Sequence, residues 1–158
     1  MLTHQELPTR RGTRPQTTTT IPQAQIDQQP DDARHVDAIL AEAATWPSVH
    51  QTTSGISVEG ARALALDPSA VGGPVEAFMV GQEFCHVHAG GDHSLHLMLP
   101  VPLAEAATGA GWAEPHFFVL TGQAPPTVVL VYAPRDDDER DVVLGLVRAS
   151  YDFARGES

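Results

Sequence analysis

The chain of 158 residues is long enough for one domain with an ordinary core, and 42% of its residues are hydrophobic. Its formal net charge of −11 argues against a nucleic-acid-binding surface, which needs clustered basic residues, and disfavours docking to anionic lipid. All nine basic residues are arginines, so Schiff-base, pyridoxal phosphate and P-loop chemistry that depends on a lysine is excluded.

Cys85 is the only cysteine, which excludes an intrachain disulfide and a cysteine-rich zinc site. No apolar run approaches the roughly 20 residues that span a bilayer, and the N-terminus lacks the apolar stretch of a secretory signal. We therefore expect a cytoplasmic protein with no nucleic-acid or membrane partner. A homo-oligomer is compatible with this composition.

Residues 1–32 are rich in Thr, Gln and Pro and show no hydrophobic periodicity. Such a composition is typical of a disordered tail, because it offers too little apolar surface to offset the entropy of ordering. We expect a solubilising leader, with docking onto a partner or a second copy of the chain as the alternative. The folded domain is then predicted to cover residues 33–156.

A helix is predicted from the N-capping pair Asp31-Asp32 to Trp46, where Pro47 stops it. Short strands separated by turn residues follow, and the last two form a hairpin. These strands are predicted at residues 49–56, 62–66, 75–80, 83–88 and 94–99.

The second half of the chain begins with a short helix over residues 103–108, closed by Gly109 and Gly111. A weak strand is predicted over 117–120 and a buried strand over 127–132. An acidic run then starts a final helix with one apolar stripe: Val142, Val143, Leu146, Val147, Ser150 and Phe153. Antiparallel strands flanked by helices predict a single α+β domain, with a mainly antiparallel sheet and helices packed on one face.

Four of the eight histidines lie within eleven residues on the predicted hairpin. Leu95, Leu97 and Leu99 must face the core, since burying each contributes about 1.5–3 kcal/mol. If Cys85 and Val87 pair on that leucine side, the hairpin needs a connection of odd length, most simply Gly90-Gly91-Asp92.

This register predicts that His86, His88, Ser94 and His96 share the opposite face, with Phe84 beside them. Cys85 is then a core residue, and Glu83 lies on the leucine side, either solvated or as a buried base. His93 is expected in the loop. Three imidazoles on one face suit a mononuclear Zn, Fe or Mn site that activates water or dioxygen. The alternative is a polar face whose histidines meet solvent.

Four segments together resemble a small domain family labelled "luciferase family" in actinobacterial genomes, with relatives in fungi. The resemblance covers roughly residues 35–155 and is supported upstream by 55–57 and 60–64. The segments are Gly81–His88, Asp92–Leu97, Gly111–His116 and Tyr132–Asp136. The family name does not imply light emission, and the chain is too short for the TIM barrel of flavin-dependent luciferases.

The resemblance singles out His88, His96, Glu114, His116 and Arg135. It implies His88, His96 and His116 as the principal metal ligands, with His86 as a further ligand. Glu114, on a returning loop, is expected to act as a ligand, an orienting carboxylate or a general base; the alternative is an exposed loop charge. Arg135 is expected to bind an anionic group of a substrate, or else to pair with the neighbouring acidic residues.

Three functions remain open from the sequence. The first is a metal-dependent enzyme acting on a small organic substrate held between the histidine face and the Glu114 loop. The second is a non-catalytic module that binds a ligand or a protein. The third is a metal-free acid–base enzyme that uses His96 or His116 with Glu114.

Overall fold

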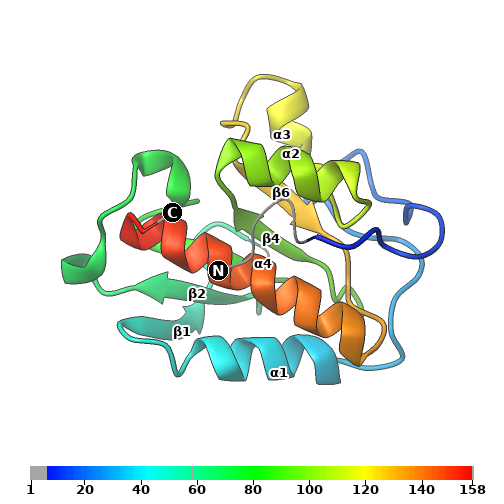
Figure 1. The fold of residues 1–158 in the computed structure, drawn as a ribbon, viewed down its shortest axis with the longest axis horizontal. Coiled ribbons are helices and arrows are strands. Elements are labelled where there is room, and N and C mark those ends of the chain that lie inside the picture. Colours follow the sequence, from blue (N-terminus) through cyan, green and yellow to red (C-terminus); the bar gives the residue numbers. More distant parts are fainter. Residues whose placement is uncertain (1–6, 58, 158) are drawn as a thin grey trace.

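A computed structural model describes residues 7–57 and 59–157. Six strands form one antiparallel sheet in the order β1-β2-β3-β4-β6-β5 (Figure 1). The strands are β1 (Val49–Thr53), β2 (Arg62–Leu66), β3 (Glu83–Val87), β4 (Leu95–Met98), β5 (Ala113–Pro115) and β6 (Val128–Val131). The predicted α+β class and the antiparallel sheet are confirmed.

Four helices accompany the sheet. The long helix α4 packs on β3 and β4 with α1 beside it, while α2 lies against β5 (Figure 1). The helices are α1 (Arg34–Ala43), α2 (Val101–Gly109), α3 (Phe117–Leu120) and α4 (Asp137–Arg155), with 3-10 turns at Pro68–Ala70 and Val75–Ala77. None of the helices in the described ranges is both long and apolar enough to cross a membrane.

Helix α4 begins where the sequence predicted it. The Asp136 carboxylate accepts a hydrogen bond from the Glu139 backbone N–H at 2.9 Å, which caps the helix, and Gly156 ends it with a φ of 80°. The predicted apolar stripe is buried apart from the half-buried Val142, and Leu146 and Val147 are fully inaccessible. It faces the leucines of β4, so the helices and one sheet face enclose the core.

The hairpin has the predicted register. Cys85 pairs with Leu97, Val87 pairs with Leu95, and His86 lies directly opposite His96. Cys85 is buried in the core as expected, and burial raises the pKa of its thiol.

A β-bulge at Phe84 changes the start of β3. On β2, Leu64 pairs with Cys85 but the next residue, Ala65, pairs with Glu83, so Phe84 is the extra residue on β3. Phe84 therefore joins the core cluster, where its ring lies 6.2 Å from that of Tyr151. The predicted placement of Phe84 with the histidines and Glu83 with the leucines is wrong, because the bulge exchanges their faces.

Two predicted strands are also wrong. Residues 75–80 contain a 3-10 turn at Val75–Ala77, and residues 117–120 form helix α3, which begins because the His116 side chain accepts a hydrogen bond from the Phe118 backbone N–H. Strand β5, which pairs with β6, has no counterpart among the predicted strands.

The N-terminal segment differs most from expectation. Residues 1–6 lie outside the described part of the chain, but residues 7–32 follow an ordered path across the molecule, and we call them the strap. Arg10, Gln23 and Gln25 of the strap are buried. Leu7 packs against the core, and side-chain hydrogen bonds hold most of the rest of the strap: Gln25 Oε1, for example, accepts from the Ala133 backbone N–H at 2.8 Å.

Candidate metal centre

The face of the sheet opposite the leucines carries the histidines. His86 pairs with His96, His96 with Leu130, and Leu130 with Glu114, so these four side chains form one row across β3, β4, β6 and β5. Side chains paired across neighbouring antiparallel strands lie about 4.5–5.5 Å apart, which is why this row brings residues far apart in sequence together.

Three imidazoles converge at one end of this row. His86, His88 and His96 each offer one ring nitrogen, and these three nitrogens lie within 4.8 Å of one another. His86 Nε2 and His96 Nδ1 are 3.0 Å apart. That separation suits a hydrogen bond between imidazoles, and it also suits two adjacent ligands of one ion, because nitrogens bound at about 2.1 Å and at right angles are about 3 Å apart.

The other nitrogen of two of these rings is already engaged by a carboxylate. His86 Nδ1 lies 2.9 Å from Glu83 Oε2, and His88 Nδ1 lies 3.1 Å from Asp92 Oδ2. Carboxylates in this position orient the ring of a ligating histidine and hold the proton on the nitrogen that faces away from the metal. The arrangement therefore leaves the Nε2 atoms of His86 and His88 as electron-pair donors.

Both carboxylates are held in the charged form. Burial alone would raise the pKa of Glu83, but hydrogen bonds from His86, the Gly55 backbone N–H and Ser54 lower it overall. The pKa of Asp92 is lowered in the same way, with His88 and Ser94 as its principal donors against burial.

His96 is buried, as are His86 and His88. Burial, followed by the neighbouring His86, His88 and His116, holds the pKa of His96 well below its ordinary value, so the ring is neutral. Its Nε2 atom is buried without a hydrogen-bond partner among the described residues. Divalent transition metals bind neutral imidazoles, and His96 is a neutral imidazole that lacks one hydrogen-bond partner and lies beside two further histidines. The three residues therefore fit such an ion.

A cavity of about 370 Å³ opens above these rings. Its wall contains no charged side chain among the described residues and is largely apolar or aromatic, with Phe78, Met98 and Phe118 beside the histidines. Ile21, Pro22 and Gln23 of the strap form part of the same wall. The cavity therefore offers space for a small uncharged molecule next to the imidazoles.

His116 lines this cavity but is not one of the three converging rings. Its ring centroid lies 5.1 Å from that of His96, and its Nδ1 accepts a hydrogen bond from the Phe118 backbone N–H at 3.0 Å. Burial, followed by His86 and His88, lowers the pKa of His116. The loop residue His93 is buried and takes no part in the cluster.

Glu114 is engaged in holding the strap. Its Oε2 accepts hydrogen bonds from Thr17 Oγ1 at 2.9 Å and Gln23 Nε2 at 3.0 Å, while Oε1 accepts from the Tyr132 hydroxyl at 2.9 Å. Gln23 also accepts a hydrogen bond from the Phe117 backbone N–H at 2.7 Å. Glu114 thus reaches the histidine pocket through Gln23.

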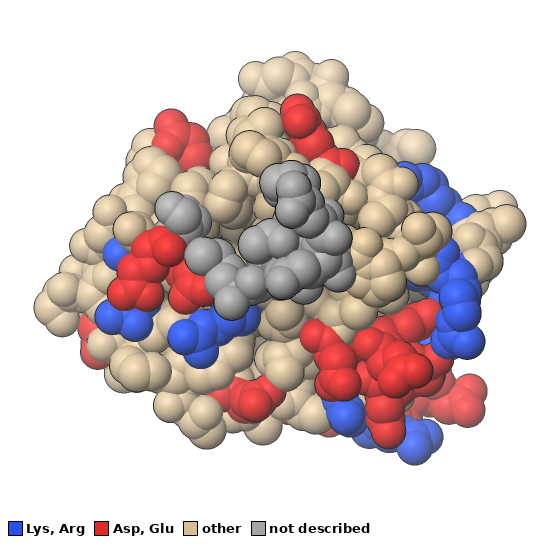
Figure 2. Space-filling model, viewed as in Figure 1, with Lys and Arg blue, Asp and Glu red and all other residues tan. Residues whose placement is uncertain are grey.

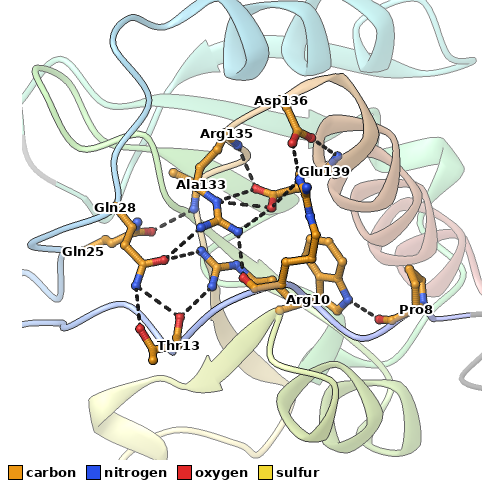
Figure 3. Close-up of polar contacts among 11 residues, drawn as sticks. Pro8, Arg10, Thr13, Gln25, Gln28, Ala133, Arg135, Asp136 and Glu139 are labelled. Atoms are coloured by element: carbon orange, nitrogen blue, oxygen red, sulfur yellow. Dashed lines mark hydrogen bonds and ion pairs between the residues drawn. The ribbon is translucent and has the colours of Figure 1, made fainter.

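Arg135 lies away from the pocket, in the network drawn in Figure 3. It forms a bidentate pair with the buried Glu139, with contacts of 2.9 and 2.5 Å, and it donates to the Gln28 side chain and to the Arg11 backbone carbonyl of the strap. Arg10 of the strap stacks over the Tyr132 ring at 5.4 Å. In this structure Arg135 therefore pairs with an acidic neighbour, which was the alternative expected from the sequence.

Sequence reasoning missed three residues of the site. Glu83 was placed on the other face because a bulge leaves no mark in the alternation pattern. Asp92 was assigned only to the turn, although its four-residue spacing from His88 was a usable signal. Gln23 lies in the strap, where nothing in the sequence pointed to the pocket.

Comparison with known proteins finds several with similar sequences. Residues 81–150 match the family model of the Luciferase domain. Proteins named Luciferase from Armillaria ostoyae and Armillaria gallica are each 28% identical over 162 residues, and one from Neonothopanus nambi is 29% identical over 163. No solved structure gave a significant match.

The alignments include 94% of this chain but 61% of each relative. The matched family segment runs from Gly81 through the histidine hairpin, β5 and β6 into α4, so it contains every histidine of the pocket. These similarities support a relationship to the luciferase-domain family.

Proposed function

We propose that the protein is a metal-dependent enzyme that binds one divalent transition metal at His86, His88 and His96 and acts on a small uncharged organic molecule. The observation that carries the proposal is the paired arrangement of the rings: converging nitrogens on one side, and the ionised Glu83 and Asp92 on the other. Zinc, iron and manganese are the candidate metals, because imidazole suits all three.

The histidines and the apolar wall of the pocket have different roles in this proposal. The three histidines would hold the metal, which supplies a Lewis acid with open positions for water or dioxygen. The apolar wall, including Phe78 and Phe118, excludes water and favours an uncharged substrate. The fungal relatives carry the name Luciferase, which agrees with an enzyme acting on an organic compound.

A second candidate is a metal-free acid–base enzyme, favoured by one observation. Glu83, His86 and His96 form a continuous hydrogen-bonded chain with steps of 2.9 and 3.0 Å. Such a chain can hold His86 in a single tautomer and pass a proton toward the pocket. In this version Glu83 takes the role that the sequence had suggested for Glu114.

The deciding experiment is thermal unfolding of untagged protein with Zn²⁺, Mn²⁺ or Fe²⁺, accompanied by elemental analysis of the purified chain. A metal at about 100 times its Kd adds about 2.7 kcal/mol to the native state, and about 1 kcal/mol shifts the Tm of a chain this size by roughly 2–4 °C. We expect a rise of about 5–10 °C at pH 7.5. The rise should vanish at pH 5, because protonated imidazoles cannot bind a metal.

Two variants make the result specific. His96→Ala removes a ring from the centre and should abolish the metal-dependent rise. His50→Ala removes an exposed histidine on β1, whose side chain is 63% accessible, and should leave the rise intact. A melting temperature that none of the three metals changes at either pH would refute the metal centre and favour the acid–base enzyme.

A further inference from the structure

The hydrogen bond at His116 fixes where this ring carries its proton. The Phe118 backbone N–H lies 3.0 Å from His116 Nδ1. A backbone amide can only donate, so Nδ1 must offer a lone pair, and the proton of the neutral ring must sit on Nε2. The same contact makes His116 the N-cap of α3, so the tautomer is tied to local folding.

The Nε2–H of His116 is available to a molecule in the pocket. The ring forms part of the cavity wall together with His96 and Phe118. No hydrogen bond within residues 7–57 and 59–157 involves Nε2, and this atom is not among the fully buried unpartnered ones. Its environment therefore differs from that of His96 Nε2, which is fully buried.

A nitrogen that carries a proton has no lone pair for a metal. His86 and His88 differ from His116 on this point, because each has an acidic partner that accepts a hydrogen bond from Nδ1–H and so leaves the lone pair on Nε2. His116 has a donor in the equivalent place. A carboxylate acceptor at Nδ1 therefore makes a ring suitable as a metal ligand, whereas a backbone N–H donor at Nδ1 makes the ring a hydrogen-bond donor through Nε2.

We infer that His116 is a hydrogen-bond donor to the bound organic molecule and not a ligand of the metal. The molecule should carry an acceptor such as a carbonyl oxygen, which Nε2–H orients above the three converging rings. This inference rests on the proposed metal centre, and it replaces the sequence-based trio of His88, His96 and His116 with His86, His88 and His96.

The tautomer is tested directly by long-range ¹H–¹⁵N NMR of the histidine rings in the full chain at about pH 8. His116 should show a protonated Nε2 and an unprotonated Nδ1. Adding Zn²⁺ should shift the resonances of His86, His88 and His96 while the His116 tautomer stays the same. A proton on Nδ1 of His116, or its transfer there on adding Zn²⁺, would overturn the inference.

Co²⁺ titration, followed by its visible absorption, separates the two proposals. His116→Asn keeps an N-capping oxygen but removes the ring, and we expect its Co²⁺ affinity to stay within about threefold of wild type. The matched His88→Asn should weaken binding by at least about 100-fold. Failure of the wild-type chain to bind Co²⁺ would refute the metal centre, whereas normal binding by wild type with loss in His116→Asn would refute the inference alone.

The donor role is tested with cyclohexanone, an uncharged probe whose carbonyl oxygen is a hydrogen-bond acceptor. Ligand-observed NMR should give a Kd that is about tenfold weaker in both His116→Asn and His116→Phe than in wild type. The phenylalanine variant keeps the ring shape and removes the donor. Equal affinity for all three chains, or no saturable binding by wild type, would contradict the donor role.

Discussion

Glu83 determines the state of His86 through a carboxylate that accepts three hydrogen bonds. The donors are Ser54 Oγ at 2.9 Å, the Gly55 backbone N–H at 3.0 Å and His86 Nδ1 at 2.9 Å. We predict that Glu83→Gln lowers the affinity for Zn²⁺ by about 10–100-fold, because a neutral amide is a weaker acceptor for Nδ1–H. Isothermal titration with Zn²⁺ measures the change.

The exposed Glu105→Gln on α2 serves as the control for that titration, since it removes one negative charge from a residue outside the pocket wall. Its affinity should match wild type. Similar losses in both variants would mean that general electrostatic attraction, and not orientation of His86, governs Zn²⁺ binding.

The ion pair of half-buried Arg135 with buried Glu139 predicts a pH-dependent contribution to stability. Burial would raise the pKa of Glu139, but hydrogen bonds from the Arg135 side chain and backbone lower it overall. A depressed pKa in the folded state means that the pair stabilises the protein above the unfolded-state pKa of glutamate and loses this effect as pH falls through the folded value. Glu139→Gln should therefore cost about 1.5–3 kcal/mol at pH 7.

Urea unfolding at several pH values tests this effect. The difference in unfolding free energy between wild type and Glu139→Gln should shrink as pH falls from the unfolded-state pKa of glutamate through the lower folded-state pKa of Glu139, because the wild-type side chain becomes neutral as well. A difference that stays constant from pH 7 to pH 3 would show that the charge of Glu139 contributes nothing.

At the scale of elements, the strap is predicted to be part of the folded unit. Its acceptors include those for Trp112 Nε1 and for the backbone N–H groups of His93, Phe117 and Ala133. A chain that begins at residue 33 should lose these bonds, at about 0.5–1.5 kcal/mol each, and its Tm should fall by at least about 5 °C. Differential scanning calorimetry gives the comparison.

The same truncated chain should weaken binding of cyclohexanone, because Ile21, Pro22 and Gln23 would no longer close the pocket. If the truncated chain had the same melting temperature as the full chain, residues 7–32 would be dispensable for folding and the prediction would be wrong.

The hairpin was predictable because its signal is physical and local. Three leucines at alternate positions can face only the core, and pairing Cys85 and Val87 on the same side sets the register that brings His86 opposite His96. The final helix was predictable from equally local signals, since its apolar stripe and the acidic residues of its first turn both indicate a helix. In both elements burial of apolar side chains decides the structure.

The strap, the bulge and α3 depend on other forces. The strap is held by amide side chains such as Gln23 and Gln25, which leave no periodic pattern. The bulge at Phe84 arises from pairing with β2, which is distant in sequence. Residues 117–120 have strand-forming side chains, but the capping bond at His116 starts a helix there.

At the scale of the whole molecule, the clustered acidic side chains lie apart from the histidine pocket. Acidic side chains gather where α1 and α4 begin, as Figure 2 shows, around a hollow of about 490 Å³ lined by five aspartates and three arginines. The histidine pocket has no charged side chain in its described wall. The net charge of −11 therefore describes the exterior and says little about the ligand.

The path of the strap has a consequence for how the protein is assembled. During synthesis, residues 7–32 leave the ribosome long before Ala133 and Arg135, the partners that hold them. Contacts so distant in sequence form late, because a long loop must close first. The strap can therefore dock only after Ala133 and Arg135 have been synthesised. The pocket wall that contains Gln23 is then completed after the sheet that carries the histidines.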